Sequence, residues 1–310
     1  MCALEESWIR TKNQAMTYGK KDLPYPYSQD FSGIVTRVKG VRESTRAALV
    51  NSLKVASYLK AGANLVERNL GAPTVVTARA DGCKEYWSGL SFLSERALSR
   101  EVAGLEPPFL RQRGTGPYRS TWASHDDYLN DLLAFLFHAM NYDPQYGAEL
   151  ETRGDWLASD ESFVDAVDRS ILHEVMAICR MPLFRLQLIV CATADRNDRI
   201  HDTIASNYAG ALEPWSKVYE QTIAARGYRL REGITLEQFT NILAAIVEGF
   251  AVRQLGDPGS DLLGEGSGEN VAGMAILGIM SSYLVPADEP RGPALRELFE
   301  STTQPNEHGE

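Results

Sequence analysis

Residues 235–256 read TLEQFTNILAAIVEGFAVRQLG, and this stretch decides the fold class of the chain. Thr235 and Gln238 match a capping box, in which the hydroxyl accepts from the N–H three residues on and the glutamine bonds back. Apolar residues then recur at spacings of three and one, which is the period of a helix with one buried face. Gly256 and Pro258 end the pattern, so the stretch predicts one long amphipathic helix.

The same helical period extends through most of the chain after Val41, and no long strand-like alternation competes with it. Pro182 fits this pattern, because a proline costs nothing at the first position of a helix, where its missing N–H has no partner. Pro214, by contrast, should bend the helix that contains it. We therefore predict an all-α protein. Besides residue 235, the predicted helix starts are Ser124, Ser159, Pro182 and Asn197.

Changes in composition divide the chain into four predicted parts. Residues 1–40 form an irregular arm, because two prolines stand among Tyr, Gly and Ser residues. The role of the arm is open between a DNA-minor-groove arm, a dimer strap and disorder. Residues 41–88 form a small helical domain, and residues 89–288 form a larger helical domain that is interrupted by the prolines and glycines of Glu106–Gly116. Residues 289–310 form a polar tail.

The overall composition is that of a globular protein, since 44% of the residues are hydrophobic and 23% are charged. This balance excludes collagen, a fully disordered chain and a disulfide scaffold. The four cysteines show no CxxC spacing, which favours free thiols in the cytoplasm. The longest uncharged run, residues 271–287, is interrupted by Gly, Ser and Pro, so we expect a buried helix and no membrane span.

Charge is distributed unevenly along the chain, whose net charge is −10. Residues 33–84 contain nine basic and three acidic side chains, a net charge of +6, so the remainder carries −16. A basic segment joined to an acidic body can bind a polyanion while the body keeps the protein in solution. The alternative is a chance fluctuation of surface charge.

The basic segment contains the pattern of a helix–turn–helix. A packing helix over Arg46–Lys60 ends at Gly62, and a short helix follows over Asn64–Leu70. Gly71-Ala-Pro73 then makes a tight turn, and Thr74–Ala80 forms the reading helix, which enters the major groove. The other interpretation is a set of small helices with a solvated basic face. The predicted base contacts are Thr74, Thr77 and Arg79, and the predicted phosphate contacts are Arg42, Arg46, Lys60, Arg68 and Lys84.

Residues 66–87, VERNLGAPTVVTARADGCKEYW, resemble the DNA-binding core of TetR-type transcriptional regulators, with Gly71 at the turn. Residues 204–227 and 235–256 resemble the last ligand-domain helix and the first dimerisation helix of the same family. The resemblance implies a regulator that binds double-stranded operator DNA as a homodimer and is released or modulated by a small-molecule effector. A similar ligand-binding protein that does not read DNA is the alternative.

The helical body is where such a regulator would hold a small apolar or aromatic effector. Aromatic and methionine side chains with a few polar groups line such a cavity, although a bundle core uses the same residues. The helices around 242–250 and 271–284 have small and apolar faces that suit a four-helix bundle between two copies, the alternative being burial within one subunit. The predicted effector-binding residues are Phe135, His138, Trp156, His173, Met176, Phe184, Asn207 and Tyr208. The predicted dimerisation residues are Ile242, Ile246, Phe250, Ile276 and Met280.

Asp126, Asp127 and Asp131 form a DDxxxD pattern that resembles the aspartate-rich motif of class I terpene synthases, in which carboxylates hold magnesium. The alternative is that acids in a first turn complement the helix dipole. The histidines show no paired-ligand spacing, and no nucleophile–base arrangement stands out. We therefore predict that the chain is not an enzyme and that it holds no metal or cofactor.

Overall fold

The computed structural model describes most of the chain, and in the described residues the chain is all-α, as predicted, apart from one antiparallel pair of short strands. The predicted reading helix Thr74–Ala80 lies outside the described residues, and so does Lys84. Nothing in the structure therefore tests that helix. The described residues are 23–40, 42–71, 89–138, 144–159, 162–192, 194–264, 270–290, 292–295 and 297.

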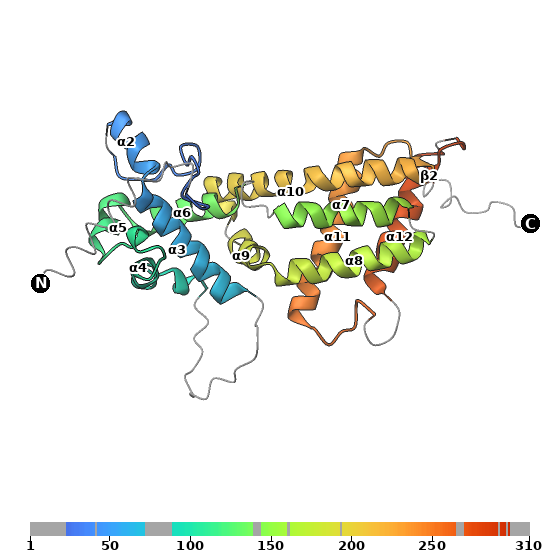
Figure 1. Cartoon of the computed structure of the whole chain (residues 1–310). Coiled ribbons are helices and arrows are strands. Elements are labelled where there is room, and N and C mark those ends of the chain that lie inside the picture. Colours follow the sequence, from blue (N-terminus) through green and yellow to red (C-terminus); the bar gives the residue numbers. More distant parts are fainter. Residues whose placement is uncertain are drawn as a thin grey trace, which may run out of the picture. The chain divides into compact units, whose positions relative to one another are not determined.

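Two compact units make up the chain (Figure 1). The first unit contains residues 1–141 and 181–207, and the second unit contains residues 142–180 and 208–310. This division differs from the predicted domains, because residues 89–138 pack with the helices that precede them.

The first unit is built around α3 (Leu53–Leu70), which α2 (Glu43–Val50) precedes. Ser52 caps α3, since its hydroxyl accepts from the N–H of Val55. The prediction that Gly62 ends this helix is wrong, because α3 continues through it. A Cβ at this position would lie 2.5 Å from the hydroxyl of Tyr128, so the glycine allows α6 (His125–Leu136) to approach α3 closely.

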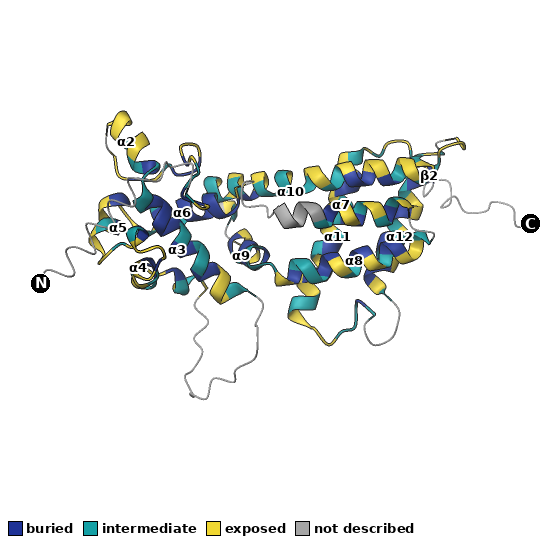
Figure 2. Ribbon diagram, in the orientation of Figure 1, coloured by how far each residue is buried: buried dark blue, intermediate teal, exposed yellow. Residues whose placement is uncertain are grey.

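Short helices surround α3 in the first unit. They comprise η2 (Ser91–Leu93), α4 (Glu95–Ala103), η3 (Pro108–Leu110), α5 (Gly116–Thr121), α6 (His125–Leu136), α9 (Pro182–Cys191), η5 (Ala194–Arg196) and the start of α10 (Asp198–Ala225). Helix α3 contacts η2, α4, η3, α5, α6 and α9 directly, and η5 contacts α9. Figure 2 shows that α3 is buried over much of its length, whereas α2 is exposed.

The described part of the predicted arm, residues 23–40, is irregular, as expected, but it packs into the core of the first unit. Phe31 and Val35 are buried, and the Phe31 ring packs edge-on against Phe135 at 5.8 Å between ring centroids. Disorder, one of the three roles left open for the arm, is therefore wrong for these residues. We call residues 23–40 the arm.

The second unit is a bundle in which α8 (Phe163–Arg180) packs against three other helices. These are α7 (Pro144–Ser159), α11 (Leu236–Gly256) and α12 (Val271–Tyr283), and the second part of α10 also belongs to this unit. The sequence did not predict the antiparallel pair of β1 (Tyr228–Leu230) and β2 (Leu284–Pro286). Among the described residues, no helix combines the length and the apolar character that a membrane crossing requires.

Four predicted helix starts are confirmed. Ser124 and Thr235 each form a complete capping box, at the start of α6 and of α11, and Pro182 opens α9. Asn197 directly precedes α10, and its side chain accepts from the N–H of Ile200. The predicted start at Ser159 is wrong, because that residue ends α7. The hydroxyl of Ser162 instead accepts from the N–H of Asp165 at the start of α8.

Candidate nucleic-acid interface

Positive charge is concentrated in the first part of the first unit. Between residues 33 and 121 the described residues include twelve basic and five acidic side chains. An excess of exposed basic side chains is the electrostatic pattern that attracts a polyanion. The exposed ones are Arg37, Lys39, Arg42, Arg68, Arg96, Arg100, Arg111, Arg113 and Arg119.

Helix α5 lies within this basic region and has one buried side and one exposed side. Tyr118 and Thr121 are buried, while Arg119 and Ser120 are exposed. The Tyr118 ring packs edge-on against Tyr58 of α3, at 5.4 Å between centroids. Both α4 and α5 contact α3, so the first unit contains two short α-helices, joined by a connection that includes η3, which rest on a third.

Polar contacts fix α5 to each of its neighbours. The guanidinium of Arg119 donates through Nε to Glu95 of α4 at 2.8 Å, and Lys54 of α3 donates to the hydroxyl of Ser120 at 3.3 Å. Burial lowers the pKa of Lys54. The N–H of Lys39 in the arm donates to the carbonyl of Thr121, the last residue of α5, at 2.7 Å. The exposed side of α5 is therefore held in one orientation by α3, α4 and the arm.

An aromatic cluster continues the buried side of α5 into α6. The Trp122 ring packs edge-on against Tyr128 at 5.0 Å between centroids, and both residues are buried. His125 lies at its margin, where Nδ1 is 2.7 Å from the hydroxyl of Tyr118. Burial lowers the pKa of His125, and the charges of Asp126 and Glu95 act in the opposite direction. The cluster is packed interior, not an open aromatic surface.

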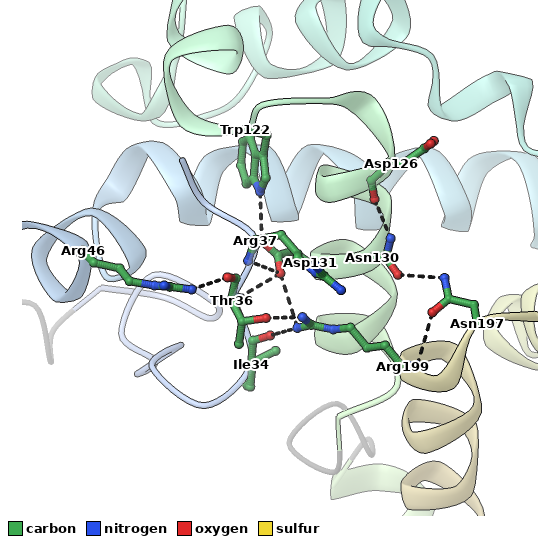
Figure 3. A network of polar contacts seen from close by, with 10 residues as sticks. All are labelled: Ile34, Thr36, Arg37, Arg46, Trp122, Asp126, Asn130, Asp131, Asn197 and Arg199. Carbon is green, nitrogen blue, oxygen red and sulfur yellow. Dashed lines mark hydrogen bonds and ion pairs between the residues drawn. The ribbon is translucent and has the colours of Figure 1, made fainter. Parts of the chain in front are cut away.

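Asp131 of α6 connects three segments of the first unit (Figure 3). Its side chain is fully buried and accepts from the backbone N–H of Thr36 at 2.8 Å and of Arg37 at 3.0 Å. It also accepts from Trp122 Nε1 at 2.9 Å. A buried carboxylate with several donors holds those donors in place, because moving one away leaves charge unsatisfied.

Arg199, in the first turn of α10, completes this network (Figure 3). Its guanidinium donates to the carbonyl of Ile34 at 3.1 Å and to the hydroxyl of Thr36, and it lies 3.5 Å from Asp131. Burial raises the pKa of Asp131, and the three hydrogen bonds and the charge of Arg199 lower it in part. The arm, α6 and the start of α10 thus share one polar network.

The predicted DNA contacts that the structure describes belong to α2, with the residue before it, and to α3, and they differ in exposure and partners. Arg42 is exposed at the start of α2, whereas Arg46 donates to the carbonyl of Thr36 in the arm. Lys60 is half-buried on α3. Arg68 pairs with Glu101 of α4 at 2.6 Å, with 61% of its side chain exposed.

Sequence analysis missed α5 and the role of Asp131. The prolines and glycines of Glu106–Gly116 were interpreted only as a break, although Pro117 directly after them is a helix-start signal. Asp131 enters the sequence analysis only within the DDxxxD pattern. Its partners Thr36 and Arg37 lie 95 and 94 residues away in the sequence, so no local pattern connects them to it.

The predicted effector-binding residues are divided between the units. Phe135 is buried against the arm, and Asn207 donates to Gln187 at 3.0 Å. The second unit places the rings of Trp156 and His173 6.4 Å apart, on α7 and α8. Four residues belong to the first unit, namely Phe135, His138, Phe184 and Asn207, and four to the second, namely Trp156, His173, Met176 and Tyr208.

Two of the predicted dimerisation residues are buried within their own chain. Ile276 is 1% exposed and Met280 is 6% exposed, because α12 packs against α8 and α11. They are core residues and offer no surface to a second copy. The other three predicted residues, Ile242, Ile246 and Phe250, are half-buried.

The aspartate-rich motif does not form a carboxylate cluster. Asp127 completes the capping box with Ser124, and Asp131 faces the buried network. No group of three His, Cys, Asp or Glu side chains suited to a metal ion occurs among the described residues. The capping interpretation is therefore confirmed for Asp127, and the geometry gives no support to magnesium chemistry at this motif.

Comparison with known proteins found no family model, no curated protein and no solved structure that matches the chain. The resemblance to TetR-type regulators therefore stands on the sequence motifs alone. Function must accordingly be argued from the site, since a helical fold by itself implies none.

Proposed function

We propose that this chain is a transcriptional regulator that binds double-stranded DNA through the first unit and responds to a small-molecule effector. The observation that carries the proposal is the two-sided character of α5, where Tyr118 and Thr121 are buried and Arg119 and Ser120 are exposed. A helix–turn–helix needs a second helix anchored on one side and free to contact DNA on the other.

The α4–α5 pair supports this function by its packing. Both helices rest on α3, as in a three-helix DNA-binding unit, although the connection from Gly104 to Thr115 is longer than the usual turn of about three or four residues. The surrounding excess of basic side chains would supply phosphate contacts, which position a protein on DNA without reading its sequence.

Arg119 is the residue on α5 best suited to base readout. An arginine fork can donate two hydrogen bonds to O6 and N7 of guanine in the major groove, and its rigid plane fixes their geometry, whereas lysine is a flexible point charge. Only Nε of Arg119 is engaged by Glu95, and 70% of the side chain is exposed. The hydroxyl of Ser120, beside it, donates to the carbonyl of Pro117 and accepts from Lys54, which leaves one lone pair to accept from a base edge.

Two helices compete for the role of reader, α5 and the predicted helix Thr74–Ala80. The test selects a preferred duplex from a random pool with the full-length chain and measures its affinity by fluorescence anisotropy. We expect Arg119→Ala to weaken this complex by about tenfold, as expected for a loss of about 1–3 kcal/mol of base contacts. Arg119→Lys should keep the salt dependence but relax the sequence preference. Lys217→Ala, on the second unit, is the control.

The outcome separates three possibilities. Loss of affinity in Arg119→Ala but not in Arg79→Ala assigns reading to α5. The reverse result assigns reading to Thr74–Ala80 and contradicts the role of α5. A wild-type chain that selects no duplex, at any salt concentration, is a helical ligand-binding protein that does not read DNA.

Dimerisation would use the outward side of α11 and α12. Val252 is 43% exposed and Met274 is 51% exposed, although both side chains are apolar. Gly249 and Gly278 face open space, where another helix can approach closely. Met274→Glu should convert a dimer into a monomer in sedimentation velocity, whereas Val164→Glu, at an exposed position on α8, should not.

The effector would be sensed in the second unit, where Trp156, Met176 and Tyr208 are half-buried. Binding would shift the population between conformers that differ in DNA affinity, by as much as the effector prefers one of them. An apolar probe, 8-anilinonaphthalene-1-sulfonate, should bind the wild-type chain and bind Trp156→Ala more weakly. Unchanged binding in Trp156→Ala would place the effector elsewhere.

A further inference from the structure

We propose that the arm forms a second DNA contact beside α5, in which Arg37 and Lys39 bind backbone phosphates and Asp131 is the positioning residue. The inference rests on the proposed function, because it takes α5 as the neighbouring reader. It assigns a partner to a segment that sequence analysis left open, and it gives the buried carboxylate a purpose that the metal motif did not.

The backbone places the arm against the end of α5. The N–H of Lys39 donates to the carbonyl of Thr121 at 2.7 Å, and Val38 forms an antiparallel bridge with Trp122. The Cα of Lys39 is thus directly beside the last residue of the proposed reading helix. A duplex in contact with Ser120 and Arg119 would therefore have its backbone within reach of a long lysine side chain.

Side chains alternate from Arg37 to Lys39. Val38 is buried, whereas Arg37 and Lys39 on either side of it are exposed. Residues two apart on an extended segment lie on the same side, so the two cations share the outer side. The acidic residue of the arm, Asp30, accepts from the hydroxyl of Ser32 and from Asn51, and no acidic residue occurs from residue 31 to residue 42.

Arg37 and Lys39 form the cationic edge of the arm, and Asp131 fixes the position of this edge from its buried side. It accepts from the N–H groups of Thr36 and Arg37, the residues at which the chain turns its charge outward. The charge of the carboxylate is directed at Arg199 and Trp122 and away from solvent. Asp131 therefore orders the arm without competing for the phosphates.

DNA fits this edge better than an acidic protein segment does. The arm carries point charges but no exposed apolar side chain between Ile34 and Lys39, and a protein partner normally buries apolar or aromatic side chains at the centre of its interface. Phosphate contacts need only cations at fixed spacing.

The first experiment measures the salt dependence of duplex affinity by fluorescence anisotropy. Arg37→Ala and Lys39→Ala should each reduce the log–log slope by about one unit, the expected loss for one phosphate contact. Both should weaken binding to selected and unselected duplexes equally, because phosphates carry no sequence information. Lys217→Ala, an exposed lysine of the second unit, should leave the slope unchanged.

The second experiment tests the positioning role by hydrogen exchange of the DNA-free chain. Asp131→Asn removes the negative charge and places an NH₂ group, itself a donor, where the carboxylate accepted hydrogen bonds. The backbone amides of Thr36 and Arg37 should therefore exchange faster with solvent. In the Asp131→Asn chain, adding Arg37→Ala should change the salt slope little, because the edge is no longer ordered. If Asp131→Asn does not fold, Arg199→Ala, which removes the guanidinium bonds to Ile34 and Thr36, replaces it.

Failure of this inference is distinguishable from failure of the proposed function. If Arg119→Ala weakens binding while the two arm variants behave like Lys217→Ala, the arm inference is wrong and the proposed function stands. If the wild-type chain binds no duplex, the proposed function fails and the arm contact fails with it. Unchanged amide exchange at Thr36 and Arg37 in Asp131→Asn contradicts the positioning role alone.

Discussion

Gly62 illustrates how a single missing methyl group determines the packing of the first unit. A Cβ there would lie 2.5 Å from the Tyr128 hydroxyl and 2.6 Å from Leu132, both on α6. The hydroxyl of Tyr128 donates to the carbonyl of Tyr58, so it cannot move away freely. Gly62→Ala should therefore lower the free energy of unfolding by about 1–3 kcal/mol through overpacking, as measured by urea denaturation.

Gly154→Ala is the matched control, since that glycine is also inside a helix. Its Cβ would meet Val218 at 3.6 Å, an ordinary van der Waals contact. The alanine should stabilise α7 by about 0.5–1 kcal/mol through helix propensity. Equal effects of the two substitutions would mean that the approach of α6 to α3 does not depend on Gly62.

His125 should make the stability of the first unit depend on pH. Burial lowers its pKa below the ordinary 6.5, so near pH 6 the folded chain binds fewer protons than the unfolded chain. The free energy of unfolding therefore decreases as the pH falls from above 6.5 through the lowered pKa. Thermal unfolding between about pH 7.5 and about pH 5.5 should show a smaller decrease in Tm for His125→Phe than for the wild-type chain.

The exposed histidine of α10 provides the control for this pH effect. The side chain of His201 is 69% exposed, so His201→Gln should follow the wild-type profile. Carboxyl groups such as Asp131, whose pKa is raised by burial, have the opposite sign and add stability as the pH falls toward 3.8. A His125→Phe profile parallel to that of the wild type would contradict the assignment.

At the scale of elements, the capping boxes are the features that sequence reasoning predicts best. Thr235 accepts from Gln238 N at 3.1 Å, and the Gln238 side chain accepts from Thr235 N at 3.0 Å. Thr235→Ala should lower the free energy of unfolding by about 1 kcal/mol, whereas Thr235→Ser keeps the hydroxyl and should lose little. Chemical denaturation of both variants tests this, and equal losses would show that the hydroxyl does not act as a cap.

Local signals explain which elements could be predicted from the sequence. A cap, a proline at the first helical position and an apolar period all act within a few residues, so the starts at Ser124, Pro182 and Thr235 were correctly placed. The helix end predicted at Gly62 is wrong because the prediction used only the low helix propensity of glycine. In the structure, the close contact between α3 and α6 requires a glycine within the helix.

The candidate site was harder to predict because its contacts are distant in the sequence. Helix α5 has six residues, too few to show an apolar period, and Tyr118 is buried only because Tyr58 and Trp122 surround it. The hydrogen bonding of Asp131 likewise depends on Thr36, which is 95 residues away in the sequence. The sequence did indicate a basic region, since charge content needs no knowledge of contacts.

At the scale of the whole molecule, the division into two units limits what one stability measurement can report. Helix α10 contributes residues to both units, yet each unit has its own core, around α3 in the first and α8 in the second. Two cores of this kind commonly unfold in separate steps, so each unit has its own free energy of unfolding, and a substitution changes that of the unit that contains it. Variants placed in one core therefore serve as markers for its transition.

Differential scanning calorimetry should show two transitions, each sensitive to one set of substitutions. Gly62→Ala should lower the Tm of the transition that belongs to the first unit and leave the other unchanged. Thr235→Ala should do the reverse, because α11 packs against α8 and α12 of the second unit. A single transition that both variants shift together would show that the continuous α10 couples the two cores. In that case, a perturbation of the second unit would reach the Arg199–Asp131 network through the same helix.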